Sequence, residues 1–197
     1  MIKIGVTGGI ATGKSTVLNI MRNFGASTCS ADEIAQNLMR SGTDLTWRVC
    51  QEFPDCCSWS TDGTPSVDRQ KLGSVVFTDT RARQVLDSLT HPRIVEVLRS
   101  TSDAWNCSGV QVGAIEIPLL YEAGLENMVD FIVVVACSET EQIRRLTERG
   151  LSESDAQARI SAQLPQDLKE QKANVVVRTD LSTSQLRSDV QAVLQSL

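Results

Sequence analysis

One segment constrains the fold of this chain more than any other, and it reads Gly8-Gly9-Ile10-Ala11-Thr12-Gly13-Lys14-Ser15. It fits the pattern G-x-x-x-x-G-K-[ST], whose glycines let successive backbone N–H groups turn toward a phosphate. The apolar run at 2–7 before it is typical of a buried strand, and the one-sided apolar pattern at 14–24 after it is typical of a helix. Because strand, loop and helix in this order are the context in which the pattern binds phosphate, we predict a nucleotide-binding protein. A glycine-rich turn that only caps a helix is the alternative.

The polar groups of the loop indicate how a nucleotide would be held. Lys14 has the length to reach the β- and γ-phosphates, and the Ser15 hydroxyl is a ligand that suits Mg²⁺. Glu116 ends an apolar strand and is a candidate second acidic group for Mg²⁺, through a water; a solvated strand-end carboxylate is the alternative. A GTPase switch is disfavoured, since no glycine has an aspartate three positions before it and no Asn-Lys pair occurs.

Apolar runs and helical patterns alternate along the chain. Strands are expected at 2–7, 26–30, 110–117, 131–136 and 175–177, with helical patterns between them. This alternation predicts an α/β fold, a mainly parallel sheet with helices on both faces, within a single domain spanning 1–197. Separate helices are expected at 80–89 and 92–105, because Pro92 suits the first turn of a helix. Residues 41–67 show no regular pattern.

Composition narrows the class of protein. The net charge is −5, from 19 Lys and Arg against 24 Asp and Glu, which argues against bulk nucleic-acid binding. The longest apolar run, at 131–137, is far shorter than a membrane span, and the first residues show no secretory leader. We therefore expect a cytoplasmic protein without nucleic-acid or membrane partners. The six cysteines and the single histidine form no zinc-binding spacing, and we expect the cysteines to stay reduced.

Several further segments together resemble one family of kinases. They are Ala31-Asp32-Glu33-Ile34-Ala35, Asp68-Arg69-Gln70-Lys71-Leu72, His91-Pro92-Arg93-Ile94, Pro118-Leu119-Leu120-Tyr121-Glu122, and Gln142-Ile143-Arg144-Arg145-Leu146-Thr147-Glu148-Arg149, with Gln163 further on. With the loop, and in this order, they resemble the dephospho-CoA kinase family over nearly the whole chain. The resemblance implies a five-stranded parallel P-loop kinase core, a helical substrate-binding subdomain near 60–105 and a mobile lid near 138–165. It also implies the reaction, in which ATP with Mg²⁺ phosphorylates the ribose 3′-hydroxyl of dephospho-CoA.

The resemblance also implies roles for individual residues. Asp32 is expected beside the acceptor hydroxyl as a proton acceptor or orienter, although an Asp that caps a helix is the alternative. With Lys14 and Arg145 it makes up the expected catalytic set. The ATP site is expected to comprise Gly8, Gly9, Ile10, Ala11, Thr12, Gly13, Lys14, Ser15 and Thr16, with Arg145, Arg149 and Thr179. The acceptor site is expected to comprise Asp32, Arg69, His91, Arg93, Pro118, Leu119, Leu120 and Glu122.

The chain departs from the pattern of that family at four positions, one of which is Asn174, where an aspartate is usual. Ala11 stands where a third glycine is usual, and an alanine is strained by a positive φ. Ser30 stands where an aspartate is usual, which leaves Asp32 as the single carboxylate of that pair. Thr179 stands where an asparagine near the adenine is usual, so the preference for one nucleotide base is open.

Two other functions are compatible with the same loop. The chain could be a different P-loop kinase, which phosphorylates a nucleoside monophosphate or another metabolite hydroxyl. It could also be a non-catalytic nucleotide sensor in which residues 41–67 bind a partner. The segment at 118–122 favours the CoA precursor. Asp32 weighs against a sensor, since a protein that only binds nucleotide has no use for a group that activates a hydroxyl.

Overall fold

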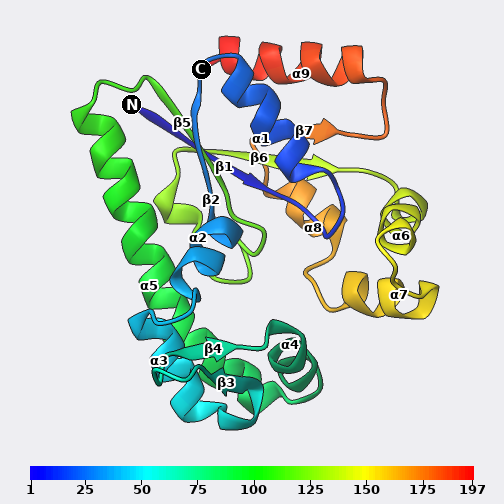
Figure 1. Ribbon diagram of the computed structural model, residues 1–197. Coiled ribbons are helices and arrows are strands. Elements are labelled where there is room, and N and C mark those ends of the chain that lie inside the picture. The colour runs from blue at the N-terminus through cyan, green and yellow to red at the C-terminus, as the bar shows by residue number, and fades with distance from the viewer. The chain divides into compact units, whose positions relative to one another are not determined.

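A five-stranded parallel sheet organises the larger of two units in the computed structural model, which describes residues 1–197 (Figure 1). We call residues 1–30 and 102–197 the core unit and residues 31–101 the insert unit. The strands are β1 (Ile2–Thr7), β2 (Ser27–Ser30), β5 (Val112–Glu116), β6 (Phe131–Ala136) and β7 (Val175–Arg178). Their order across the sheet is β2-β5-β1-β6-β7, and all neighbours are parallel. This confirms the α/β fold expected from the alternating pattern.

Two helices cover one face of this sheet. The helices α1 (Lys14–Asn23) and α9 (Thr183–Gln195) lie side by side, as Figure 1 shows. Val17 and Met21 of α1 and Val190 of α9 are fully buried in one cluster with strand residues such as Val6 and Val133. Because side chains alternate along a strand, Val134 points to the opposite face, where it too is fully buried. Burial on both faces explains the nearly continuous apolar runs in the sequence.

The remaining helices of the core unit are α6 (Glu139–Glu148), α7 (Glu153–Ser161) and α8 (Gln166–Gln171), with a 3₁₀ turn at Glu126–Met128. Serine side chains begin three of the unit's helices: Ser138, Ser152 and Ser182 each accept the backbone N–H of the residue three positions on. Such capping satisfies N–H groups that have no partner within the helix.

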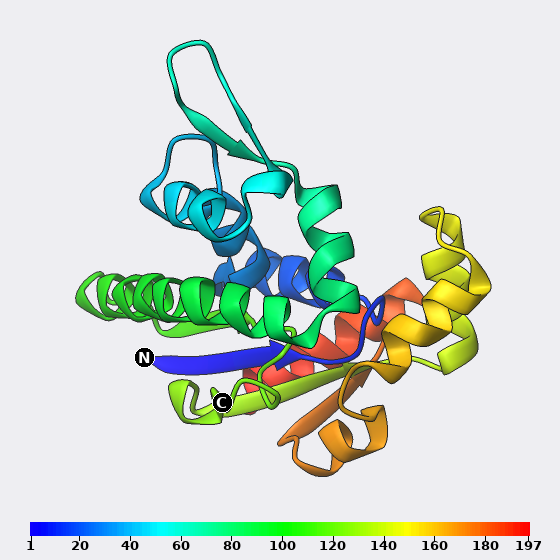
Figure 2. The same ribbon diagram turned by 90° about the horizontal axis from the view of Figure 1, so that it is seen from below.

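The insert unit has its own small apolar core. It consists of α2 (Ala31–Leu38), α3 (Asp44–Glu52), a 3₁₀ turn at Pro54–Cys56, the hairpin of β3 (Cys57–Trp59) and β4 (Pro65–Val67), α4 (Arg69–Thr78) and most of α5 (Thr80–Cys107). Figure 2 shows the hairpin as two adjacent antiparallel segments joined by a turn. Leu45, Val49, Cys56 and Leu72 are buried together. The stretch 41–67, which shows no pattern in the sequence, thus folds as a helix and a hairpin around shared contacts.

The expectation of two helices around Pro92 is wrong, because α5 runs unbroken from Thr80 to Cys107 with Pro92 inside it. A proline within a helix removes one hydrogen bond and costs about 3 kcal/mol. Apolar side chains on both sides of it are packed, with Leu86 and Leu89 before it and the fully buried Leu98 after it. Their burial outweighs the lost bond. None of the helices, the 28-residue α5 included, is both long and apolar enough to span a bilayer.

The expectation that all six cysteines stay reduced is also wrong. Cys50 and Cys57 form a disulfide within the insert unit, whereas Cys29, Cys56, Cys107 and Cys137 are free. The end of α3 and the start of β3 bring the two Cα atoms to 5.7 Å, a separation at which a disulfide can form. The sequence spacing of seven residues did not indicate this pairing, because it spans a helix end and a 3₁₀ turn that had no pattern of their own.

Candidate active site

The conformation of the loop between β1 and α1 depends on two glycines. Gly8 has φ 145°, and a Cβ atom there would lie 2.1 Å from the carbonyl oxygen of Val135. Gly13, with φ 92°, precedes the first residue of α1. Ala11 is the one residue other than glycine with a positive φ, 59°. This left-handed conformation costs an alanine about 1–2 kcal/mol, which is the strain expected at this position.

The second half of the loop offers unpaired donors. The backbone N–H groups of Ala11, Gly13 and Ser15 donate to no acceptor in the protein. They lie at and just before the N-terminus of α1, where the helix dipole also favours an anion. Successive N–H groups in this arrangement form a concave binding site for a phosphate.

The side chains of Lys14 and Ser15 add an ammonium group and a hydroxyl to the loop. The ammonium of Lys14 is buried and donates to the carbonyl oxygens of Gly8 at 3.2 Å and Gly9 at 2.8 Å. The Ser15 hydroxyl lies 3.3 and 3.4 Å from the two carboxylate oxygens of Glu116. Glu116 is the buried last residue of β5 and lies beside Val6 in the sheet. A hydroxyl and a single carboxylate fit Mg²⁺, which prefers oxygen ligands and takes most of them from water and substrate phosphates.

Arg145 ties α6 to the loop and to the end of β7. Its Nη1 donates to the Ala11 carbonyl and to the Thr179 hydroxyl, both at 3.0 Å, and its Nη2 donates to the Thr179 carbonyl at 2.9 Å. The Thr179 hydroxyl in turn donates to the Thr12 carbonyl at 2.5 Å. Thr179 is therefore a buried support beneath the loop in this structure.

The charges on α6 are arranged around Glu141. This carboxylate accepts from Nε of Arg145 and from Arg144, each at 2.7 Å. The hydrogen bond from Arg144, supported by Arg145, lowers the pKa of Glu141 to about 2.

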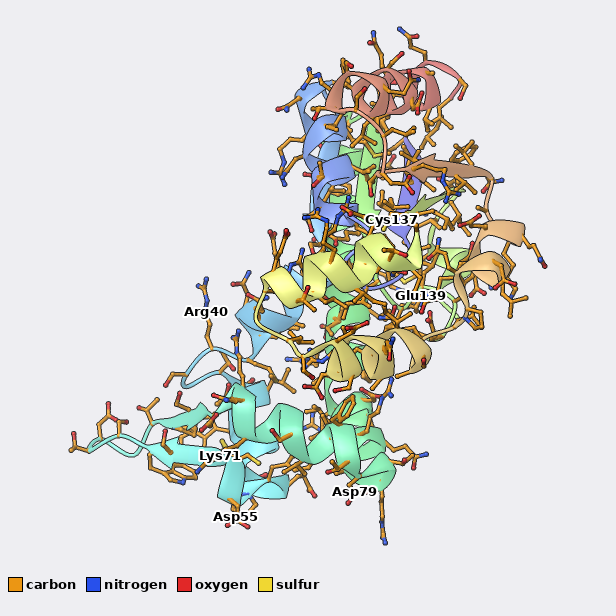
Figure 3. The ribbon with its side chains drawn as sticks, turned by 90° about the vertical axis from the view of Figure 1, so that its right-hand side faces the viewer. Arg40, Asp55, Lys71, Asp79, Cys137 and Glu139 are labelled. Atoms are coloured by element: carbon orange, nitrogen blue, oxygen red, sulfur yellow. A yellow bond between two sulfur atoms is a disulfide. The ribbon has the colours of Figure 1, made fainter.

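Arg149 follows the last residue of α6 and is exposed, without an ion pair. Figure 3 shows Cys137 and Glu139 at the junction where β6 passes into α6. Burial raises the pKa of the Cys137 thiol.

The segment 118–122 after β5 is one of those that carry the resemblance, and it makes an additional contact with α8. Leu120 is fully buried, and the Pro118 carbonyl accepts from the Thr7 hydroxyl at 3.2 Å. Glu122 forms an ion pair at 2.8 Å with Lys169 of α8, whose side chain is fully buried, and accepts the backbone N–H of Leu164 at 3.1 Å. Burial opposes the charge on Glu122, but the hydrogen bonds from Lys169 and the backbone outweigh it and lower the pKa.

The other residues expected in the acceptor site belong to the insert unit. Asp32 is exposed in the first turn of α2. Arg69 begins α4 and donates to the Gln36 carbonyl at 2.9 Å. His91 and Arg93 lie within α5. Nε2 of His91 is 3.5 Å from Oδ1 of Asp87, and Nη1 of Arg93 is 2.9 Å from Oε2 of Glu96. Their roles toward an acceptor stay predictions.

The sequence did not indicate two residues of α8, namely Gln166, which contacts the loop, and Lys169, which pairs with Glu122. Gln166 accepts the N–H of Gly9 at 3.0 Å. Gln142 and Gln163, which belong to the segments carrying the resemblance, also contact the loop, with Ile10 as their partner. Nothing in the six-residue α8 marks Lys169 as buried, because a lysine in so short and polar a helix is usually exposed.

Comparison with known proteins gives a consistent result. A family model described as dephospho-CoA kinase matches residues 2–185. The chain is 37% identical to the dephospho-CoA kinase of Geobacillus kaustophilus, over 98% of this chain and 96% of that protein. Its structure is similar to that of a Thermus thermophilus protein (TM-score 0.81, 30% identity, 100% and 97% of the two chains). It is also similar to a dephospho-CoA kinase from Campylobacter jejuni (TM-score 0.70, 26% identity, 98% and 95%).

The contacts of Thr179 predict that its first effect is on stability. Thr179→Val keeps the shape but removes the hydroxyl that bonds to Thr12 and Arg145. We expect the free energy of unfolding to fall by about 1–2 kcal/mol in urea denaturation, because a buried carbonyl and a guanidinium lose a partner. Thr183→Val, an exposed change at the start of α9, serves as the control. Equal stability of the two variants would contradict the supporting role and favour a role in base recognition alone.

Proposed function

The chain belongs to the dephospho-CoA kinase family, and on that premise we propose that it transfers the γ-phosphoryl group of ATP to the ribose 3′-hydroxyl of dephospho-CoA, giving coenzyme A and ADP. The observation that carries this proposal is the phosphate loop, with donors of its second half unpaired and with Lys14 and Ser15 in place, in a chain similar to such kinases over its whole length. We place the reaction in the cytoplasm.

On the ATP side, the chain's contribution is positioning and neutralisation of charge, which together account for most of phosphoryl-transfer catalysis. The N–H groups of Ala11, Gly13 and Ser15 would cradle the phosphates. Lys14 would exchange its two carbonyl partners for phosphate oxygens. Ser15 and Glu116 would hold Mg²⁺, which neutralises the negative charge of the β- and γ-phosphates. Arg145 and the exposed Arg149 lie on the α6 side, in the expected lid at 138–165.

On the acceptor side, Asp32 would accept or orient the proton of the 3′-hydroxyl. Arg69, His91 and Arg93, all in the insert unit, supply positive charge and hydrogen-bond donors suited to the substrate's diphosphate. Pro118, Leu119 and Leu120 would form an apolar wall, and Glu122, through its ion pair with Lys169, would hold that wall against α8. Closure of the lid would exclude water, which competes with the hydroxyl for the phosphoryl group.

A panel of acceptors tests the function. Purified protein with ATP and Mg²⁺ is assayed for ADP release with dephospho-CoA, with AMP, with CMP and without acceptor. We expect turnover with dephospho-CoA alone, with coenzyme A as the product by mass spectrometry. Turnover with a monophosphate would point to another kinase specificity. ATP binding without turnover on any acceptor would support a nucleotide sensor instead.

The role of Asp32 is tested by Asp32→Asn, which removes the base but keeps the size of the side chain. We expect kcat to fall by about 10²-fold or more, the usual scale of general-base catalysis, with little change in the KM for ATP. Glu33→Gln, an exposed neighbour in the same first turn of α2, is the matched control. If the Asp32 variant keeps kcat within a few-fold of the parent protein, Asp32 only caps the helix and takes no part in the chemistry.

A further inference from the structure

Three glutamines hold the first half of the phosphate loop. Gln163 accepts the backbone N–H of Ile10 at 2.8 Å, and Gln166 accepts that of Gly9 at 3.0 Å. Gln142 donates from its Nε2 to the Ile10 carbonyl at 2.6 Å. They come from α6, from the turn after α7 and from α8, so segments more than 130 residues away along the chain meet at two residues of the loop. We call Gln142, Gln163 and Gln166 the glutamine bracket.

The loop is shaped to receive this bracket. A Cβ atom on Gly9 would lie 2.7 Å from Nε2 of Gln142 and 3.1 Å from Oε1 of Gln166. Both amide groups would have to move away from the loop to admit a Cβ atom, although the φ of Gly9 is not positive. A glycine at position 9 therefore lets the two amide groups approach the backbone of the loop closely. Gln142 is itself 4% exposed, so its contact with the loop excludes water.

An ion pair between the fully buried Lys169 and the partly exposed Glu122 holds the part of the chain that carries Gln163 and Gln166. Glu122 accepts the N–H of Leu164, the residue next to Gln163, and pairs with Lys169, one turn beyond Gln166. Gln166 also donates from its Nε2 to Glu170 at 3.2 Å, which orients its oxygen toward Gly9. Removal of Glu122 would leave the ammonium of Lys169 buried without its carboxylate, which is costly, so this contact resists displacement.

The chemistry of the bracket matches its place beside a polyphosphate site. The N–H groups of Gly9 and Ile10 need acceptors, since an unpaired buried donor is costly. Carboxylates could supply them but would repel the phosphates nearby, whereas neutral amides satisfy the donors without adding negative charge. The second half of the loop keeps its donors for the ligand.

We propose that the glutamine bracket positions the phosphate loop for phosphoryl transfer, with Gln163 as its decisive member. Gln163 and Gln166 keep Gly9 and Ile10 in place when nucleotide is bound as well as before, and thereby set the direction of the N–H groups of Ala11, Gly13 and Ser15. The glutamines touch the loop and not the reacting atoms, so they are positioning residues. The consequence for turnover rests on the proposed kinase function, but the consequence for nucleotide affinity does not.

Gln163 allows a sharp test, because its Oε1 accepts the Ile10 N–H and its Nε2 is not needed for that contact. Gln163→Met keeps the length and removes the acceptor, whereas Gln163→Glu restores an acceptor and adds a charge. Gln157→Met, at an exposed position of α7, is the control. Folded protein is quantified for each variant, kcat and the KM for ATP are measured, and the affinity for a non-hydrolysable ATP analogue with Mg²⁺ is measured by calorimetry.

We expect Gln163→Met to lower kcat by about 30-fold or more and to weaken binding of the analogue, since displacement of catalytic groups by about 1 Å can cost 10²-fold. Gln163→Glu should recover most of kcat, with a KM for ATP above that of the parent protein because the new carboxylate repels the phosphates. A kcat per folded molecule within three-fold of the parent for Gln163→Met would overturn the proposal. So would tighter binding of the analogue to Gln163→Met, because the glutamine would then be competing with phosphate. Failure of the parent protein to turn over dephospho-CoA would count against the proposed function alone, since the calorimetric comparison stands without it.

Discussion

The hydrogen bonding of the backbone N–H groups in the phosphate loop is the constraint on which the rest of the site depends. Such donors must be paired within the protein or bond to solvent or a ligand. The loop between β1 and α1 does both, because the donors of Gly9 and Ile10 are taken by glutamine oxygens, whereas those of Ala11, Gly13 and Ser15 have no acceptor in the protein. The sheet and its helices hold these two halves in a single conformation.

The sequence predicted those features that depend on local pattern. The loop, the five strands and the proximity of Ser15 and Glu116 all followed from residues near in sequence or from the ends of neighbouring parallel strands. The α/β fold was expected for the same reason, since strands that are buried on both faces leave continuous apolar runs. The strain expected at Ala11 is present as a positive φ, which the loop pattern itself requires.

Contacts distant in sequence could not be predicted. Helix α5 continues through Pro92 because of burial on both of its sides, and the disulfide of Cys50 with Cys57 depends on where a helix and a hairpin end. Lys169 is buried only because Glu122 meets it from another part of the chain. Thr179, expected from the family pattern near the adenine, contacts the loop through its hydroxyl. In each case tertiary packing overrides what the local residues favour.

The division of the loop into a protein-bound half and a phosphate-binding half can be measured directly. Backbone amide signals are followed by ¹H–¹⁵N NMR while a non-hydrolysable ATP analogue is added with Mg²⁺. We predict large shifts and slowed hydrogen exchange for the amides of Ala11, Gly13 and Ser15, with those of Gly9 and Ile10 nearly unchanged. If the amides of Gly9 and Ile10 shift most, the glutamines give way to the nucleotide and do not hold the first half of the loop.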